Sequence, residues 1–149
     1  MEIWIRNDFE ETAEVDETTL RNRARKILSA LGCDEAELSV WLCTDESIRT
    51  LHRDYFQDDS PTNVISFAQR EGEFADVAPE VLGDVVISVD TARRDAREAG
   101  VPLEDELTFL LIHGVLHLLG YDHEGDQLHR AAEMEAREAE IYRKVLDEA

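Results

Sequence analysis

Three of the five histidines in this 149-residue chain lie within one short segment, as His113, His117 and His123. His113 and His117 are four residues apart, so on a helix both rings project from one face and can bind the same ion. Gly120 follows, and glycine readily adopts the left-handed conformation that ends a helix and turns the chain back. That turn allows His123 to supply a third ligand. Three imidazoles leave a fourth position open to water, which is the arrangement of a catalytic zinc site.

The segment therefore predicts one bound Zn²⁺ ion, with the water on the metal as the reactive group. Zinc is favoured over nickel or copper because three neutral imidazoles suit it and because it is readily available. The alternative is that these histidines are hydrogen-bonded core residues. The other two histidines, His52 and His129, have no such neighbours in the sequence, and we interpret both as surface or incidental residues.

The histidine pattern is similar to the metzincin metalloprotease signature, with one difference. In that signature, Glu follows the first histidine and acts as the general base. Gly114 occupies the position here, and glycine cannot accept a proton. The sequence thus retains a metzincin-like zinc-site helix but lacks the peptidase base.

The elements that position the histidines follow from hydrophobic periodicity and from helix caps. Strands are predicted over 2–7, 38–43, 63–67 and 82–88. Helices are predicted from an Asp16 cap to Gly32, from Thr44 or Asp45 through Phe56, from an Asp90 cap to Gly100, over 103–119, and from Gly125 or Asp126 to the end. This order predicts an α+β fold with helices packed on a four-stranded mixed sheet, in a single domain over 1–149.

The charge of the chain is strongly negative, with 35 acidic and 15 basic residues and a formal net charge of −20. This charge argues against broad, nonspecific binding of nucleic acid. Two interpretations remain open: a well-hydrated acidic surface, or an acidic face that carries a local basic or metal-centred patch. No segment has the length of apolar sequence that a membrane span or a signal peptide needs, so we expect a cytoplasmic protein with no membrane partner.

The two cysteines match no metal-ligand spacing. Cys43 lies in the apolar run 40–43, which is typical of a small core residue. A disulfide between Cys33 and Cys43 is not expected in a cytoplasmic protein.

Three motifs resemble those of the bacterial YbeY family of metal-dependent endoribonucleases and ribosomal RNA maturation factors. Residues 113–123, His-Gly-Val-Leu-His-Leu-Leu-Gly-Tyr-Asp-His, match its hallmark, and residues 59–67 and 82–87 match its Pro-Thr motif and its Leu-Gly-Asp strand. The resemblance implies an α+β fold with zinc on His113, His117 and His123. It also implies maturation and quality control of 16S ribosomal RNA, with action on single-stranded RNA and small-subunit proteins as partners.

One position departs from that family, which usually has Arg directly after the tyrosine that precedes the Pro-Thr motif. Phe56 follows Tyr55 here, and phenylalanine can neither hold a phosphate nor stabilise its charge. Arg53, one helical turn earlier, is a candidate catalytic replacement, and a solvated helix residue is the alternative.

Three further polar residues are candidates for supporting roles. Asn63 and Ser66 are candidates for lining a substrate groove, or else are solvated residues on an edge strand. Asp122 either orients His123 or caps the turn. No general base is identifiable, so attack by water and attack by the ribose 2′-hydroxyl both remain open.

The preferred interpretation is a zinc-dependent endoribonuclease. The alternatives are a non-catalytic ribosome assembly factor stabilised by zinc and, less favoured because of Gly114, a metallopeptidase.

Overall fold

The computed structural model describes residues 1–8, 15–56, 62–68, 81–120 and 127–147. The strands are β1 (Glu2–Asn7), β2 (Glu37–Cys43), β3 (Val64–Ala68) and β4 (Val81–Ser88). The helices are α1 (Glu17–Ala30), α2 (Asp45–Phe56), α3 (Val89–Ala99), α4 (Leu103–Leu118) and α5 (Gln127–Asp147). The predicted element order and the α+β fold class are confirmed.

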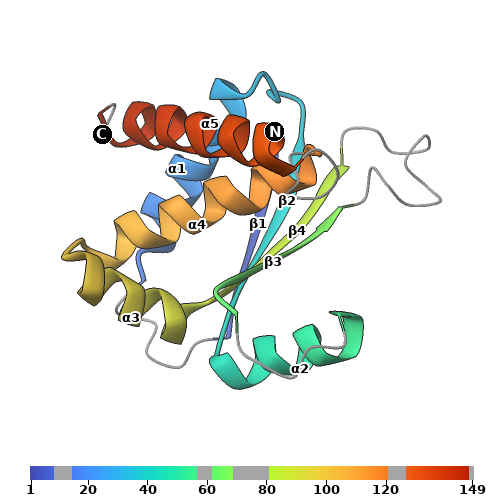
Figure 1. The fold of residues 1–149 in the computed structure, drawn as a ribbon, viewed down its shortest axis with the longest axis vertical. Coiled ribbons are helices and arrows are strands. Elements are labelled where there is room, and N and C mark those ends of the chain that lie inside the picture. Colours follow the sequence, from blue (N-terminus) through green and yellow to red (C-terminus); the bar gives the residue numbers. More distant parts are fainter. Residues whose placement is uncertain (9–14, 57–61, 69–80, 121–126, 148–149) are drawn as a thin grey trace.

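The four strands form one mixed sheet in the order β1-β2-β4-β3. β1, β2 and β4 are parallel to one another, whereas β3 runs antiparallel to β4 at the edge. Helices α1, α3, α4 and α5 lie on one side of the sheet, and α2 lies on the other (Figure 1). The two faces of the sheet are therefore covered unequally.

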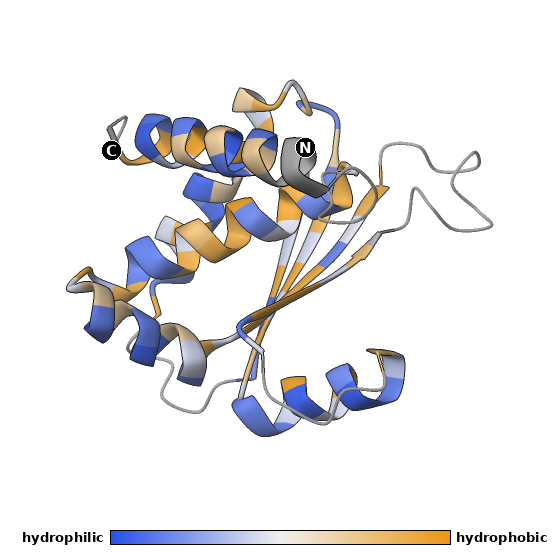
Figure 2. Cartoon of the chain, viewed as in Figure 1, coloured by the Kyte–Doolittle hydropathy of each residue, from blue (hydrophilic) through white to orange (hydrophobic). Residues whose placement is uncertain are grey.

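Helix α4 is the centre of the core. Its residues from Leu107 to Leu118 are apolar nearly all round, as expected of a helix buried on several sides. Nine of its residues are buried, and it packs against β3, β4, α1, α3 and α5. Figure 2 shows hydrophobic colour concentrated on the strands and on α4, whereas α2 and α5 carry much more hydrophilic colour. An ion pair ties α1 to the start of α4, because Arg23 donates to Asp105 at 3.0 Å and to Thr108 at 2.9 Å.

Two helix caps agree with prediction and one does not. The Asp16 carboxylate caps α1, and Gly100 ends α3 in the left-handed conformation, with φ 71°. The cap predicted at Asp90 is wrong: Ser88 accepts the hydrogen bond from the Thr91 amide. Because β4 runs directly into α3, its last residue is the cap, and Asp90 lies in the first turn of the helix.

Cys43 is a core residue, as predicted. It is completely buried, and this burial raises the pKa of its thiol to about 12. Both cysteines are free thiols.

In the described part of the chain, no helix has the length and apolar character needed to cross a membrane.

Asp45 joins the start of α2 to the start of α3. Its Oδ1 accepts hydrogen bonds of 2.6 Å from both Ser88 and Thr91, and its Oδ2 accepts one of 2.8 Å from Arg94. Burial alone would raise the pKa of the carboxyl, but the three donors outweigh burial and hold the pKa below its ordinary value. The charged form of Asp45 therefore stabilises this junction.

We predict that Asp45→Asn destabilises the protein most near neutral pH. A depressed pKa in the folded state contributes stability that is complete above the ordinary carboxyl pKa of about 3.9. That contribution is lost as the pH falls through the folded-state value. Urea unfolding at a series of pH values should show the gap between wild type and Asp45→Asn shrinking below about pH 4. Glu98→Gln, at an exposed position on α3, should track wild type throughout; a constant Asp45→Asn gap would contradict the prediction.

Candidate functional site

The structure brings His113 and His117 together on one face of α4. Their Nε2 atoms are 3.0 Å apart, and their ring centroids are separated by 4.6 Å. Two nitrogens bound to one tetrahedral zinc ion lie about 3.3 Å apart, given Zn–N bonds of about 2.05 Å. The two Nε2 atoms therefore fit a shared metal ion with only a small adjustment.

Glu138 of α5 contacts the other nitrogen of the first histidine. Its carboxylate oxygen Oε1 pairs with Nδ1 of His113, and Glu138 is only 7% exposed. A proton on Nδ1 that is donated to this carboxylate leaves the lone pair on Nε2, which points toward His117. Carboxylates behind metal-binding histidines fix the tautomer and the ring orientation in this way. The contact thus prepares His113 to bind a cation.

Sequence reasoning did not identify Glu138, although a signal for it exists. Among the residues of α5 whose burial the structure describes, 132–146, the buried ones are Met134, Glu138, Ile141 and Val145. They recur at the three- and four-residue spacing of a helix face that packs inward. A charged residue within such an apolar stripe needs a partner, because an unpaired buried charge is costly.

Gly114 faces the sheet at a very close approach. A Cβ atom at this position would lie 2.6 Å from Cγ1 of Val85 on β4 and 3.3 Å from Oγ of Ser66 on β3. Ser66 in turn donates a hydrogen bond of 2.9 Å to the Gly114 carbonyl. The position at which metzincins carry their Glu therefore has no room for a side chain, and the Ser66 hydroxyl ties β3 to α4.

The remaining candidates from the sequence lie apart from the histidine pair. Arg53 is on α2, on the opposite side of the sheet (Figure 1), and bonds to Asp54 at 3.2 Å. Phe56 is 51% exposed, with its ring 6.1 Å from that of Phe67. The Asn63 carbonyl accepts a hydrogen bond from the Ser88 amide at the start of β3.

Several predicted residues cannot be placed. His123 and Asp122 lie outside the described residues, as does the side chain of His129. Within the described ranges, no group of three His, Cys, Asp or Glu side chains could hold a metal. Of the three predicted metal ligands, His113 and His117 are therefore the two that the structure describes, and Glu138 adds a contact that was not predicted.

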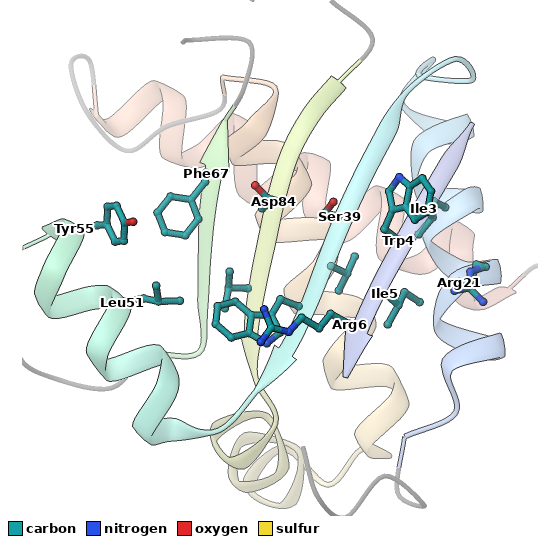
Figure 3. Close-up of a pocket in the computed structure, with 13 residues that line it drawn as sticks. Ile3, Trp4, Ile5, Arg6, Arg21, Ser39, Leu51, Tyr55, Phe67 and Asp84 are labelled. Carbon is teal, nitrogen blue, oxygen red and sulfur yellow. The ribbon is translucent and has the colours of Figure 1, made fainter. Parts of the chain in front are cut away.

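A groove of about 670 Å³ lies on the sheet face away from α4. Phe67 follows Ser66 on β3 and so points to this opposite face. Figure 3 shows Tyr55, Phe67, Asp84 and Trp4 spread across the groove, from α2 to the β1 edge. Both tryptophans of the chain, Trp4 and Trp41, line it. The groove is aromatic and open, and it is separate from the histidine pair.

A known protein family matches nearly the whole chain. The profile of the family described as Endoribonuclease YbeY matches residues 5–146. The chain belongs to the YbeY family. Membership confirms the family predicted from the motifs, and with it the prediction of a hydrolase of the endoribonuclease type.

Relatives named Endoribonuclease YbeY match most of the chain. The protein from Syntrophotalea carbinolica is 55% identical, over 87% of this chain and 87% of its own length. The YbeY of Geobacter sulfurreducens is 54% identical, over 83% of this chain and 82% of its own. That of Syntrophus aciditrophicus is 46% identical, over 95% and 88% respectively.

The fold also has a counterpart among solved structures. A protein of Thermotoga maritima, determined in solution, superposes with a TM-score of 0.64 over 98% of this chain and 90% of its own. Its sequence is 24% identical, so the likeness establishes the fold alone.

We predict that Gly114→Ala destabilises this YbeY protein, although alanine is the better helix former. Overpacking typically costs about 1–3 kcal/mol, and the gain in helix propensity returns at most about 1 kcal/mol. A Cβ 2.6 Å from a buried methyl carbon places the cost in the upper part of that range, so urea unfolding should show a net loss of about 1–2 kcal/mol. The double variant Gly114→Ala/Val85→Ala is the matched control. It should be less destabilised than the sum of its single variants, because removing the Val85 methyl groups makes room for the new Cβ. A Gly114→Ala protein at least as stable as wild type would contradict this packing account.

Proposed function

We propose that this YbeY protein is a zinc-dependent endoribonuclease that cuts single-stranded RNA during maturation and quality control of ribosomal RNA, with the 16S RNA of the small subunit as its substrate. The observation that carries the proposal is the convergence of the two Nε2 atoms of His113 and His117, 3.0 Å apart, in a member of an endoribonuclease family.

The proposed metal site is one Zn²⁺ ion held by His113, His117 and His123. The donor set supports this choice, because neutral imidazole is a preferred zinc ligand and Glu138 leaves the lone pair of His113 on Nε2. When bound, zinc supplies Lewis acidity toward a phosphoryl oxygen and lowers the pKa of water to about 7.

The protein's own residues position this chemistry. Glu138 holds the proton on Nδ1 of His113 and so fixes the direction of the ring. Gly114 and Ser66 hold α4 against the sheet, and thereby set the height of both histidines above it. No side chain among these residues serves as a general base toward RNA.

The ends of the cut RNA distinguish the two routes of attack. Attack by the ribose 2′-hydroxyl leaves a 2′,3′-cyclic phosphate, whereas attack by water leaves a linear phosphate at the cut. Analysis of the product ends by mass spectrometry separates them.

Proteins of the small ribosomal subunit are the proposed partners. A chain of net charge −20 attracts basic proteins and orients them by charge complementarity. Such a partner brings the enzyme to RNA without a broad basic surface on the enzyme itself.

A second function is favoured by two specific observations. Phe56 replaces the arginine usual in the family, and Arg53 belongs to α2, which lies on the opposite side of the sheet from α4 (Figure 1). These features favour a non-catalytic assembly factor, in which zinc stabilises the fold and contacts with the ribosome perform the work. A metallopeptidase is not favoured, because position 114 has no room for the Glu that such enzymes use.

Cleavage of a labelled single-stranded RNA tests the proposal. We expect the wild-type protein to cut it and a chelator to abolish cutting. The His117→Ala variant should fall to background because it lacks a ligand. The measurement is gel analysis of the products over time, with circular dichroism to show that the variants are folded.

His52→Ala is the matched control, since it removes a histidine from α2, on the far side of the sheet. It should cut at the wild-type rate. Equal cutting by wild type and His117→Ala, or none by either, would contradict the nuclease proposal and leave the assembly factor as the better account. Cutting of a denatured protein substrate would instead support a peptidase.

A further inference from the structure

Positive charge is scarce in this chain and unevenly distributed. Four of the 15 basic residues occur in the six positions 21–26, as Arg21, Arg23, Arg25 and Lys26. Helix α1 is therefore strongly basic within a chain of net charge −20. Arg23 pairs with Asp105 and Thr108 of α4. Of the other three, Arg25 is exposed, and Arg21 and Lys26 are half-buried.

Helix α5 adds to this charge across a shared pocket. A pocket of about 390 Å³ is lined by Arg25, Lys26, Ser29, Ala30 and Lys144. The chain contains only two lysines, Lys26 and Lys144, and both line this pocket. They are 118 positions apart in the sequence, so the fold and not local composition brings them together.

Helices α1 and α5 are in direct contact beside the pocket. Arg137 of α5 donates to the Ala30 carbonyl at the end of α1 at 3.4 Å, and it also pairs with Glu140 at 3.0 Å. The nearby Glu140 carboxylate is thus already paired. Ser29 at the pocket is likewise bonded to Asp34, at 2.9 Å.

We propose that the pocket of Arg25, Lys26 and Lys144 binds backbone phosphates of single-stranded RNA. The inference rests on the proposed function, since it identifies where this nuclease holds its substrate. This pocket would be the local basic patch that was one of the two interpretations of the acidic composition. Lys and Arg contacts to phosphates supply most of the sequence-independent affinity of nucleic-acid binding.

The position of the pocket suits a strand that reaches the histidine pair. Arg137 and Glu138 are neighbours on α5, one contacting α1 and the other contacting His113. Lys144 lies six residues further along, about 9 Å along the helix axis. A strand that follows α5 would pass from the basic pocket to the histidines within a short distance.

Two features favour an extended polyanion over a small free anion. Arg25 and Lys144 are exposed, and the charges are spread over two helices. Arg21, one turn before Arg25, lines the aromatic groove and lies beside β1 at its edge (Figure 3). A basic stripe next to exposed aromatic rings is the combination by which proteins hold the backbone and unpaired bases of single strands.

Matched pairs of substitutions test this inference. Arg25→Gln/Lys144→Gln removes two exposed charges from the pocket, and Arg49→Gln/Arg97→Gln removes two from exposed positions on α2 and α3. Both double variants have the same net charge. Binding of the full-length proteins to a fluorescent single-stranded RNA is measured by anisotropy at several salt concentrations, with a chelator present to prevent cutting, and a gel confirms that the RNA stays intact.

The pocket variant should bind about tenfold more weakly, and its salt dependence should fall by about 1.4, or about 0.7 for each lost phosphate contact. The control variant should change by less than about threefold. Equal weakening in both variants would mean that only overall charge matters and would overturn the proposal. A wild-type protein that does not bind the RNA would overturn it as well.

Acylation of lysine amines provides an independent readout, because the only two lysines line the pocket. Mass spectrometry should show both lysines protected by RNA at low salt and reactive again at high salt. Unchanged labelling would overturn the proposal. If RNA binding depends on the pocket but the RNA is not cut, the nuclease function is contradicted and the phosphate site is supported. If the RNA is cut but binding does not depend on the pocket, the phosphate site is contradicted and the nuclease function is supported.

Discussion

Helix α4 lies as close to the sheet as it does because Gly114 has no side chain. A Cβ there would meet Val85 at 2.6 Å, and the Ser66 hydroxyl bonds to the Gly114 carbonyl across the same gap. This approach sets the rotation and depth of the helix. Its neighbour His113 then faces α5, and His117 follows one turn later on the same face. The buried core on one side of α4 and the histidine pair on the other thus depend on one contact between a helix and two strands.

Much of the fold could be predicted because its local signals agree with one another. The alternation in β1, the Asp16 cap of α1 and the Gly100 end of α3 each predict the same element that packing later stabilises. The Asp90 cap failed for a local reason, since a strand that leads directly into a helix provides its own last residue, Ser88, as the cap. Sequence spacing alone cannot decide whether Ser88 or Asp90, two positions apart, caps the helix.

The candidate site could be predicted only where it is local in sequence. His113 and His117 share one helix, so their spacing defined their geometry. Glu138 reaches His113 from 25 residues away, and Lys144 meets Lys26 from another helix, so both depend on tertiary packing. Arg53 was a candidate to replace the arginine missing at Phe56, with a solvated helix residue as the alternative; it lies on α2, which covers the opposite face of the sheet from α4. The sequence pattern does not show which face of the sheet each helix covers.

Zinc affinity of Glu138→Ala tests the central claim most directly, namely that packing between α4 and α5 prepares His113 to bind a metal. Competition with a chelator should show affinity about 10–100-fold below wild type. Glu135→Ala, at an exposed position on the same helix, should keep the wild-type affinity. If Glu138→Ala binds zinc as tightly as Glu135→Ala, the carboxylate does not orient the histidine and the account of this site is wrong.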